Sequence, residues 1–123
     1  MTKLNEIYKC NVCGNMVELT HEGKGELVCC GQPMELLITK VKEEGTEKHR
    51  PIIKTDKKGI LVQVGSNPHP MAPKHHIEWI EVMDKKDVCH KYLKIGQKPQ
   101  TFFNAEKIKI ARAYCNIHGL WKN

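Results

Sequence analysis

Four cysteines near the start of the chain constrain its fold more than any other feature of the sequence. Cys10 and Cys13 form a C-x-x-C pattern, and Cys29 and Cys30 are adjacent, within a glycine-rich segment that ends near residue 37. A segment below about 40 residues buries too little apolar surface to fold unaided, so it usually requires a metal or disulfides. We therefore predict that these four side chains staple a small domain over residues 1–37.

Metal binding is the favoured explanation for this cluster, with two disulfides or simply buried thiols as the alternative. The N-terminal residues contain no segment that resembles a signal peptide, so we expect a cytoplasmic, reducing location where clustered cysteines more often bind metal. Four thiolates make a tetrahedral site that suits zinc or iron, and the cysteines alone leave that choice open. The adjacent pair can face one ion only if the backbone bends sharply, for which Gly31 is suited.

Composition limits the remaining classes of protein. The chain has 123 residues, of which 40% are hydrophobic, and no apolar run approaches the ~20 residues that cross a bilayer. We therefore expect no membrane association. The formal net charge of +6 suggests an anionic partner without saying whether that partner is a nucleic acid, an acidic protein or a small anion.

The rest of the chain reads as a polar connector over residues 38–48 followed by a second domain over residues 49–123. Short runs rich in β-forming residues recur between glycine and proline turns, and long helical periodicity is absent from the sequence, which predicts an all-β chain with an antiparallel sandwich. Residues 105–115 contain good helix formers, but their alternating isoleucines and lysines favour a strand. The other predicted strands are residues 16–19, 26–28, 60–64, 77–83, 89–93 and 101–103.

A second constellation of metal-binding residue types lies in the second domain. His69 and His75 flank a loop stiffened by prolines, which loses little entropy when its imidazoles settle on a metal. Cys115 and His118 lie three residues apart on a predicted turn, and His49 begins the domain. Four imidazoles and one thiolate form a mixed site that suits iron, copper or zinc. Five protein ligands on an octahedral ion leave one position open, which indicates chemistry rather than scaffolding.

Other histidines and cysteines fit ordinary roles better. His76 adjoins an apolar strand and is interpreted as a packing residue or a neighbour of the ligands. Cys89 has no partner motif and is expected to be half-buried. His21 and His90 lie among charged residues, so we expect them to be solvated surface histidines.

Taken together, five motifs resemble the desulfoferrodoxin family, the two-iron form of superoxide reductase, over essentially the whole chain. The motifs are 10-CNVC-13, 29-CCGQPM-34, 47-EKHRP-51, 69-HPMAPKHHIEWIE-81 and 114-YCNIHGLWK-122. The resemblance implies a desulforedoxin-like N-terminal domain and an immunoglobulin-like β-sandwich. It further implies one iron on four cysteines and a second iron on four histidines and a cysteine. The implied ligands are Cys10, Cys13, Cys29 and Cys30 for the first iron, and His49, His69, His75, His118 and axial Cys115 for the second.

The same resemblance implies an enzyme that transfers one electron to superoxide and forms hydrogen peroxide. Glu47 would cap the open position of the second iron in its oxidised state, and Lys48 would attract and orient the anion. Preorganised positive charge of this kind stabilises an anionic intermediate. The family also implies a rubredoxin-type electron donor and a homodimer.

The sequence departs from the family pattern at three positions, and none of them removes an implied ligand. Arg50 stands where a small apolar residue is expected, His76 where an aromatic residue is more familiar, and Leu120 where a histidine is frequent. Two other functions compete with the reductase. A zinc-ribbon protein that binds nucleic acid would explain the cysteines and the basic charge but not the second constellation, and its dispersed lysines lack interleaved aromatics. A rubredoxin-like electron carrier would use the first site alone.

Overall fold

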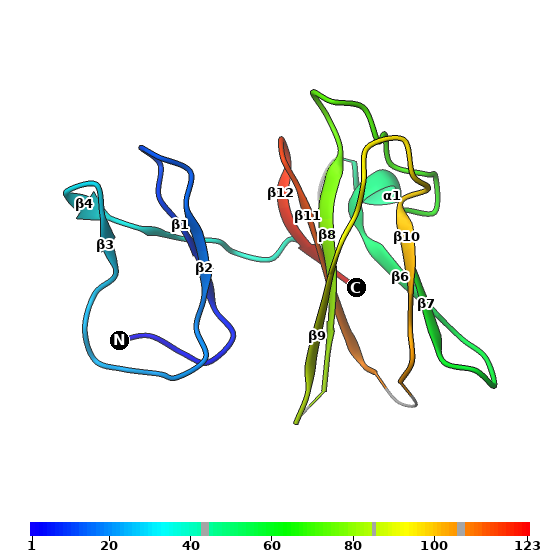
Figure 1. Cartoon of the computed structure of the whole chain (residues 1–123), viewed down its shortest axis with the longest axis horizontal. Helices are drawn as coiled ribbons and strands as arrows, with labels where there is room; N and C mark the ends of the chain where they lie inside the picture. The colour runs from blue at the N-terminus through cyan, green and yellow to red at the C-terminus, as the bar shows by residue number, and fades with distance from the viewer. Residues whose placement is uncertain (43–44, 85, 106–107) are drawn as a thin grey trace. The chain divides into compact units, whose positions relative to one another are not determined.

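The computed structural model describes residues 1–42, 45–84, 86–105 and 108–123, and these form two compact units. The first unit spans Met1–Ile38 and the second spans Thr39–Asn123. Within the described residues, one four-residue helix accompanies twelve strands (Figure 1). The prediction of an all-β chain is therefore confirmed.

The first unit consists of two small antiparallel sheets with very little core. One sheet has the order β2-β1-β5 and the other is the hairpin of β3 and β4. Their bounds are β1 (Ile7–Lys9), β2 (Met16–Glu18), β3 (Val28–Cys29), β4 (Gln32–Pro33) and β5 (Glu35–Leu36). Ile7 and Cys10 are the buried hydrophobic residues among those described in this unit, which agrees with the prediction that it needs a staple.

The second unit consists of two antiparallel sheets and a short helix. The three-stranded sheet has the order β10-β7-β6, and the four-stranded sheet has the order β12-β11-β8-β9. Helix α1 (Thr46–His49) leads into β6. The strands are β6 (Pro51–Thr55), β7 (Ile60–Val64), β8 (Ile77–Met83), β9 (Val88–Tyr92), β10 (Gln100–Phe103), β11 (Ile110–Cys115) and β12 (Gly119–Lys122).

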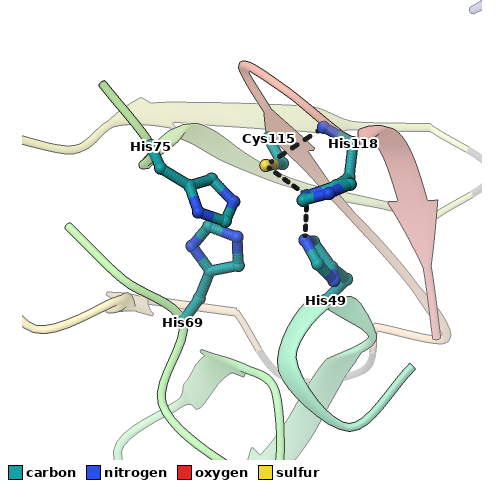
Figure 2. A group of neighbouring side chains, drawn as sticks. All are labelled: His49, His69, His75, Cys115 and His118. Carbon is teal, nitrogen blue, oxygen red and sulfur yellow. Dashed lines mark hydrogen bonds between the residues drawn. The ribbon is translucent and has the colours of Figure 1, made fainter. Parts of the chain in front are cut away.

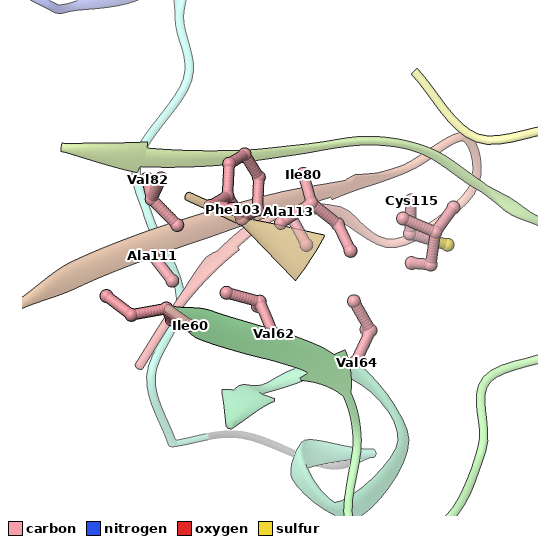
Figure 3. Close-up of a cluster of buried hydrophobic side chains, with 10 residues drawn as sticks. Ile60, Val62, Val64, Ile80, Val82, Phe103, Ala111, Ala113 and Cys115 are labelled. Carbon is pink, nitrogen blue, oxygen red and sulfur yellow. The ribbon is translucent and has the colours of Figure 1, made fainter. Parts of the chain in front are cut away.

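The core of the second unit lies between these two sheets, as Figure 3 shows. Alternate residues of β7 point into it, since Ile60, Val62 and Val64 are fully buried while the residues between them are half-buried. Facing them are side chains from β8 and β11, including Ile80 and Ala113. Two sheets that bury alternating apolar side chains against each other form a β-sandwich, so the predicted sandwich is confirmed.

Most of the predicted strands match the observed ones. The predictions for residues 60–64 and 77–83 hold at both ends, and residues 89–93 are shifted by one. The prediction for residues 26–28 is wrong except at Val28, because strand pairing begins only where Val28 faces Pro33. In the ambiguous segment 105–115, a strand begins at Ile110, and residues 106–107 lie outside the described residues, as do residues 43–44 of the predicted connector.

Three separate segments of the second unit meet at one end of the sandwich. They are α1, the loop between β7 and β8, and the turn between β11 and β12 (Figure 1). Each carries side chains of the second constellation, so the sandwich brings residues from distant parts of the sequence to one place.

Candidate metal centres

The four cysteines of the first unit lie together. Their four sulfur atoms lie within 4.8 Å of one another, and all four are free thiols rather than disulfides. The sharp bend expected at the adjacent pair is shared by two residues, since Cys30 (φ 53°) and Gly31 (φ 76°) both adopt left-handed backbone conformations. The structure thus brings together Cys10, Cys13, Cys29 and Cys30.

Backbone groups already support negative charge at this first cluster. The amides of Val12 and Cys13 donate to Cys10 Sγ at 3.4 and 3.5 Å, and the amide of Asn15 donates to Cys13 Sγ at 3.5 Å. The amides of Cys13 and Val12 lower the pKa of Cys10 to about 6, whereas hydrogen bonding with Cys13 and the other thiols raises the pKa of Cys30 to about 12. Thiols packed this closely cannot all ionise unless a cation neutralises them.

The second group contains four histidines and one cysteine whose ligand atoms lie within 4.8 Å of one another. Figure 2 shows the imidazoles turned toward one another, with the Cys115 sulfur between His75 and His118 in this view. Neighbouring rings are close: the ring centroids of His49 and His69 lie 4.6 Å apart, and so do those of His69 and His75. The members are His49, His69, His75, Cys115 and His118. We call them the His/Cys group.

Local hydrogen bonds fix the orientation of two of these imidazoles. His49 ends α1, and its Nδ1 donates to the Gly45 carbonyl at 2.8 Å. His69 Nδ1 donates to the Pro70 carbonyl at 2.7 Å. In a neutral imidazole one nitrogen donates and the other accepts, so both residues present an Nε2 lone pair to the centre of the group.

The charge state of these rings also suits metal binding. Burial lowers the pKa of His49, and burial lowers the pKa of His69 to about 4, so both are neutral at neutral pH. Burial is also the main reason that the pKa of His75 is lowered, followed by the charges of His118, His76 and Lys48. Neutral imidazole is the form that binds a metal.

Cys115 and His118 share the turn between β11 and β12. The His118 amide donates to Cys115 Sγ at 3.3 Å, and His118 Nδ1 lies 3.0 Å from His49 Nε2. Cys115 is fully buried, and burial raises the pKa of its thiol while the amides of His118 and Ile117 lower it. A cation at this place would favour the thiolate.

Two orphaned nitrogens test whether this donor set fits a metal. Among the described residues, the buried Nε2 atoms of His69 and His75 have no hydrogen-bond partner. A buried polar atom without a partner costs about 1–3 kcal/mol, and coordination to a cation would remove that cost. Imidazole nitrogens with one soft sulfur suit iron, so the residues present fit the metal that the resemblance implies.

Glu47 and Lys48 lie on α1 beside His49, and both are exposed. The Glu47 carbonyl accepts from the Asn67 amide at 2.9 Å and from Ser66 Oγ at 3.2 Å. The loop between β7 and β8 therefore holds the backbone of α1 in place and leaves both charged side chains at the surface.

The remaining histidines and the sixth cysteine lie outside both groups. His76 donates its amide to Asn116 Oδ1 at 2.9 Å, as a neighbour of the ligand loops, and His21 is exposed as expected. The prediction for Cys89 is wrong in its burial, because β9 presents it to solvent. The prediction for His90 is also wrong, because its ring is half-buried against Trp79, with centroids 4.4 Å apart.

Sequence reasoning missed two supports of the His/Cys group. The Trp121 ring stacks on His49 with centroids 4.9 Å apart and planes 18° apart, and its Nε1 donates to the His118 carbonyl at 3.2 Å. Asn116 donates from Nδ2 to the Lys74 carbonyl at 3.0 Å, in addition to accepting from His76. Asn116 lies between two candidate ligands in sequence, which was the available signal, whereas the stacking of Trp121 on His49 depends on the fold.

Among the described residues, no helix has both the length and the apolar character needed to span a bilayer.

Comparison with known proteins gives consistent matches along the chain. Residues 2–37 match the family model described as the N-terminal domain of desulfoferrodoxin, and residues 41–123 match the model described as desulfoferrodoxin. A desulfoferrodoxin homolog from Archaeoglobus fulgidus is 52% identical over 124 residues, covering 100% of this chain and 99% of that protein.

Two superoxide reductases are also similar to this chain, one in sequence and one in fold. A superoxide reductase from Pyrococcus abyssi is 37% identical over 97 residues, covering 63% of this chain and 84% of that protein. The crystal structure of the superoxide reductase from Treponema pallidum shares the fold, with a TM-score of 0.78 and 22% identity over 96% of this chain and 95% of that one. With family models matching both of its parts, the chain belongs to the desulfoferrodoxin family.

Proposed function

We propose that this protein is a superoxide reductase that forms hydrogen peroxide at the His/Cys group. The observation that carries the proposal is the convergence of four imidazoles and a buried cysteine, with two Nε2 atoms that lack a partner among the described residues. The Pyrococcus abyssi relative that is 37% identical bears the name superoxide reductase, which supports the proposal.

Each residue has a role in this proposal. Iron bound at the His/Cys group would supply one electron to superoxide. His49, His69 and His75 would hold it through Nε2, His118 through Nδ1, and Cys115 through its thiolate. The four cysteines of the first unit would hold a second iron, giving two per chain.

Lys48 and Glu47 are proposed as the catalytic side chains outside the ligand set. The exposed Lys48 ammonium would attract the superoxide anion and orient it beside His49, and its positive charge would stabilise the reduced oxygen until it is protonated. Glu47, the preceding residue on α1, would cap the His/Cys group when a metal bound there is oxidised. Both roles rest on the family motif and on the position of α1.

We further propose a division of the chain into a first domain over residues 1–37, a connector over residues 38–48 and a catalytic domain over residues 49–123. The electron donor would be a small rubredoxin-type protein, and the protein would act as a homodimer in the cytoplasm. These proposals follow from the family resemblance.

The test is the stoichiometry of the reaction between superoxide and the reduced, iron-loaded full chain. Reduction consumes one electron and two protons and yields one hydrogen peroxide for each superoxide, with no dioxygen released. Dismutation yields one dioxygen and one peroxide for every two superoxide ions. Peroxide without dioxygen supports the proposal, whereas dioxygen release or an inert protein contradicts it.

A matched pair of cysteine variants shows whether the His/Cys group is responsible. Cys115→Ser removes the buried sulfur of the group, whereas Cys89→Ser changes an exposed cysteine outside both groups. We expect Cys115→Ser to abolish peroxide formation and Cys89→Ser to retain it.

A further inference from the structure

Lys40 is fixed by its backbone to the strand that follows the Cys115–His118 turn. Its amide donates to the Leu120 carbonyl at 2.8 Å, and its carbonyl accepts from the Lys122 amide at 3.0 Å. These bonds make Lys40 a one-residue parallel extension of the sheet opposite Trp121. Because they use only the backbone, they would survive a change of the Lys40 side chain.

The Lys40 side chain reaches the structure that supports the His/Cys group. Its Nζ donates to the His118 carbonyl at 3.1 Å and lies 5.8 Å from the centroid of the Trp121 ring. The same carbonyl accepts from Trp121 Nε1, and the Trp121 ring stacks on His49. Lys40 therefore contacts both the His118 carbonyl and Trp121, the residue that stacks on His49.

The position of Lys40 also matters electrostatically. Its ammonium lies against the Cys115–His118 turn, since Nζ donates to the His118 carbonyl, and that turn carries two members of the group. Lys40 is half-buried, so its field is screened less than that of a fully exposed lysine. A positive charge held here stabilises a metal centre at the His/Cys group more in its reduced form than in its oxidised form.

We propose that Lys40 is a positioning residue of the His/Cys group, holding the His118 carbonyl and raising the reduction potential of iron bound there. The inference rests on the proposed function, because it assumes redox-active iron at that group. A fixed positive charge disfavours the more positive, oxidised metal and leaves more of the centre in the reduced form that donates an electron.

The test is an equilibrium redox titration of the iron-loaded full chain, followed at the visible band that appears when the His/Cys centre is oxidised. Lys40→Met removes the charge and the donor while keeping an unbranched stem, and Lys40→Arg keeps both. Lys42→Met is the matched control, because it removes the same charge from an exposed lysine two residues away. Thermal unfolding verifies that all variants are folded.

We expect Lys40→Met to titrate at a lower potential than the wild type. At the wild-type midpoint, its ratio of oxidised to reduced centre should be about two- to fivefold higher, as for the loss of a partly exposed charge interaction. Lys40→Arg and Lys42→Met should titrate like the wild type. A Lys40→Met variant that titrates at the wild-type potential, or a Lys42→Met variant that shifts equally, overturns the proposal.

Failure of this inference can be told apart from failure of the proposed function. If oxidation of the wild type produces no visible band from the His/Cys group, the proposed function is wrong and the inference falls with it. If the wild type shows the band and Lys40→Met titrates at the same potential as the wild type, only the proposed role of Lys40 is wrong.

Discussion

At the scale of single residues, the charge of Lys48 has the most direct expected effect on the reaction. Lys48→Ala should slow the reaction with superoxide by about three- to tenfold and weaken its dependence on ionic strength, because an exposed cation beside the site steers the anion. Rapid mixing at several salt concentrations measures both effects. Lys58→Ala, at an exposed lysine in a turn, is the control, and an unchanged rate in Lys48→Ala would remove this lysine from the mechanism.

Gly65 is a second residue with a specific expected effect, because it lets the loop after β7 approach α1. Its φ is +84°, and a Cβ there would lie 2.4 Å from the Asn67 carbonyl oxygen and 2.6 Å from that of Lys48. Gly96 has a similar φ of +88° with no described atom within 4 Å of such a Cβ. Gly65→Ala should therefore lower the free energy of unfolding by about 1–3 kcal/mol more than Gly96→Ala does.

Chemical denaturation of the two variants measures that difference. Since both substitutions strain the same backbone conformation, the difference isolates the collision with the Lys48 and Asn67 carbonyls. Equal losses of stability would show that the loop and α1 can separate without cost.

Several residues of the two candidate centres could be predicted from the sequence alone. Cys10, Cys13 and the adjacent pair were singled out by spacing, because their segment has almost no other core. His69 and His75 were singled out by the prolines between them. The half-buried ring of His90 was missed, since Trp79, which it packs on, comes from the adjacent strand.

At the scale of elements, two ligand-bearing segments are joined through one side chain. Asn116, in the β11–β12 turn, accepts from the His76 amide and donates to the Lys74 carbonyl, so it ties the turn to the loop that carries His75. Asn116→Ala should lower the free energy of unfolding by about 1–2 kcal/mol, which corresponds to two side-chain hydrogen bonds. It should also weaken iron binding at the His/Cys group.

Asn116→Asp is the matched control for that prediction. The aspartate keeps the acceptor for the His76 amide but turns a carboxylate oxygen toward the Lys74 carbonyl oxygen, which repels it, so its loss of stability and of iron should be at least as large as that of Asn116→Ala. Thermal unfolding and iron retention under a chelator measure the two effects. Wild-type stability and iron retention in Asn116→Ala would show that the two segments are held by other contacts.

Element prediction succeeded where side chains alternate and failed where the fold supplies the pairing. Residues 60–64 alternate between buried and half-buried positions, so the sequence carries the strand directly. β6 begins at a proline and β12 at a glycine, and both are strands because β7 and β11 pair with them. The stacking of Trp121 on His49 depends on those pairings and could not be read from the sequence.

At the scale of the whole molecule, the two candidate centres belong to different compact units. The cysteines of the first centre lie within Met1–Ile38, and every member of the His/Cys group lies within Thr39–Asn123. Cys13→Ser should therefore lose the first iron and retain peroxide formation by the second. Metal analysis with the stoichiometric assay checks both, and complete loss of activity in a folded variant would contradict this division of labour.

Each chain should hold two iron centres of different kinds, and a visible absorption spectrum of the pure protein, with its iron and zinc quantified, tests this. We expect two iron atoms per chain, thiolate bands from the four-cysteine centre, and a further band that appears on mild oxidation. A colourless protein that contains stoichiometric zinc would contradict this expectation and favour the zinc-ribbon alternative.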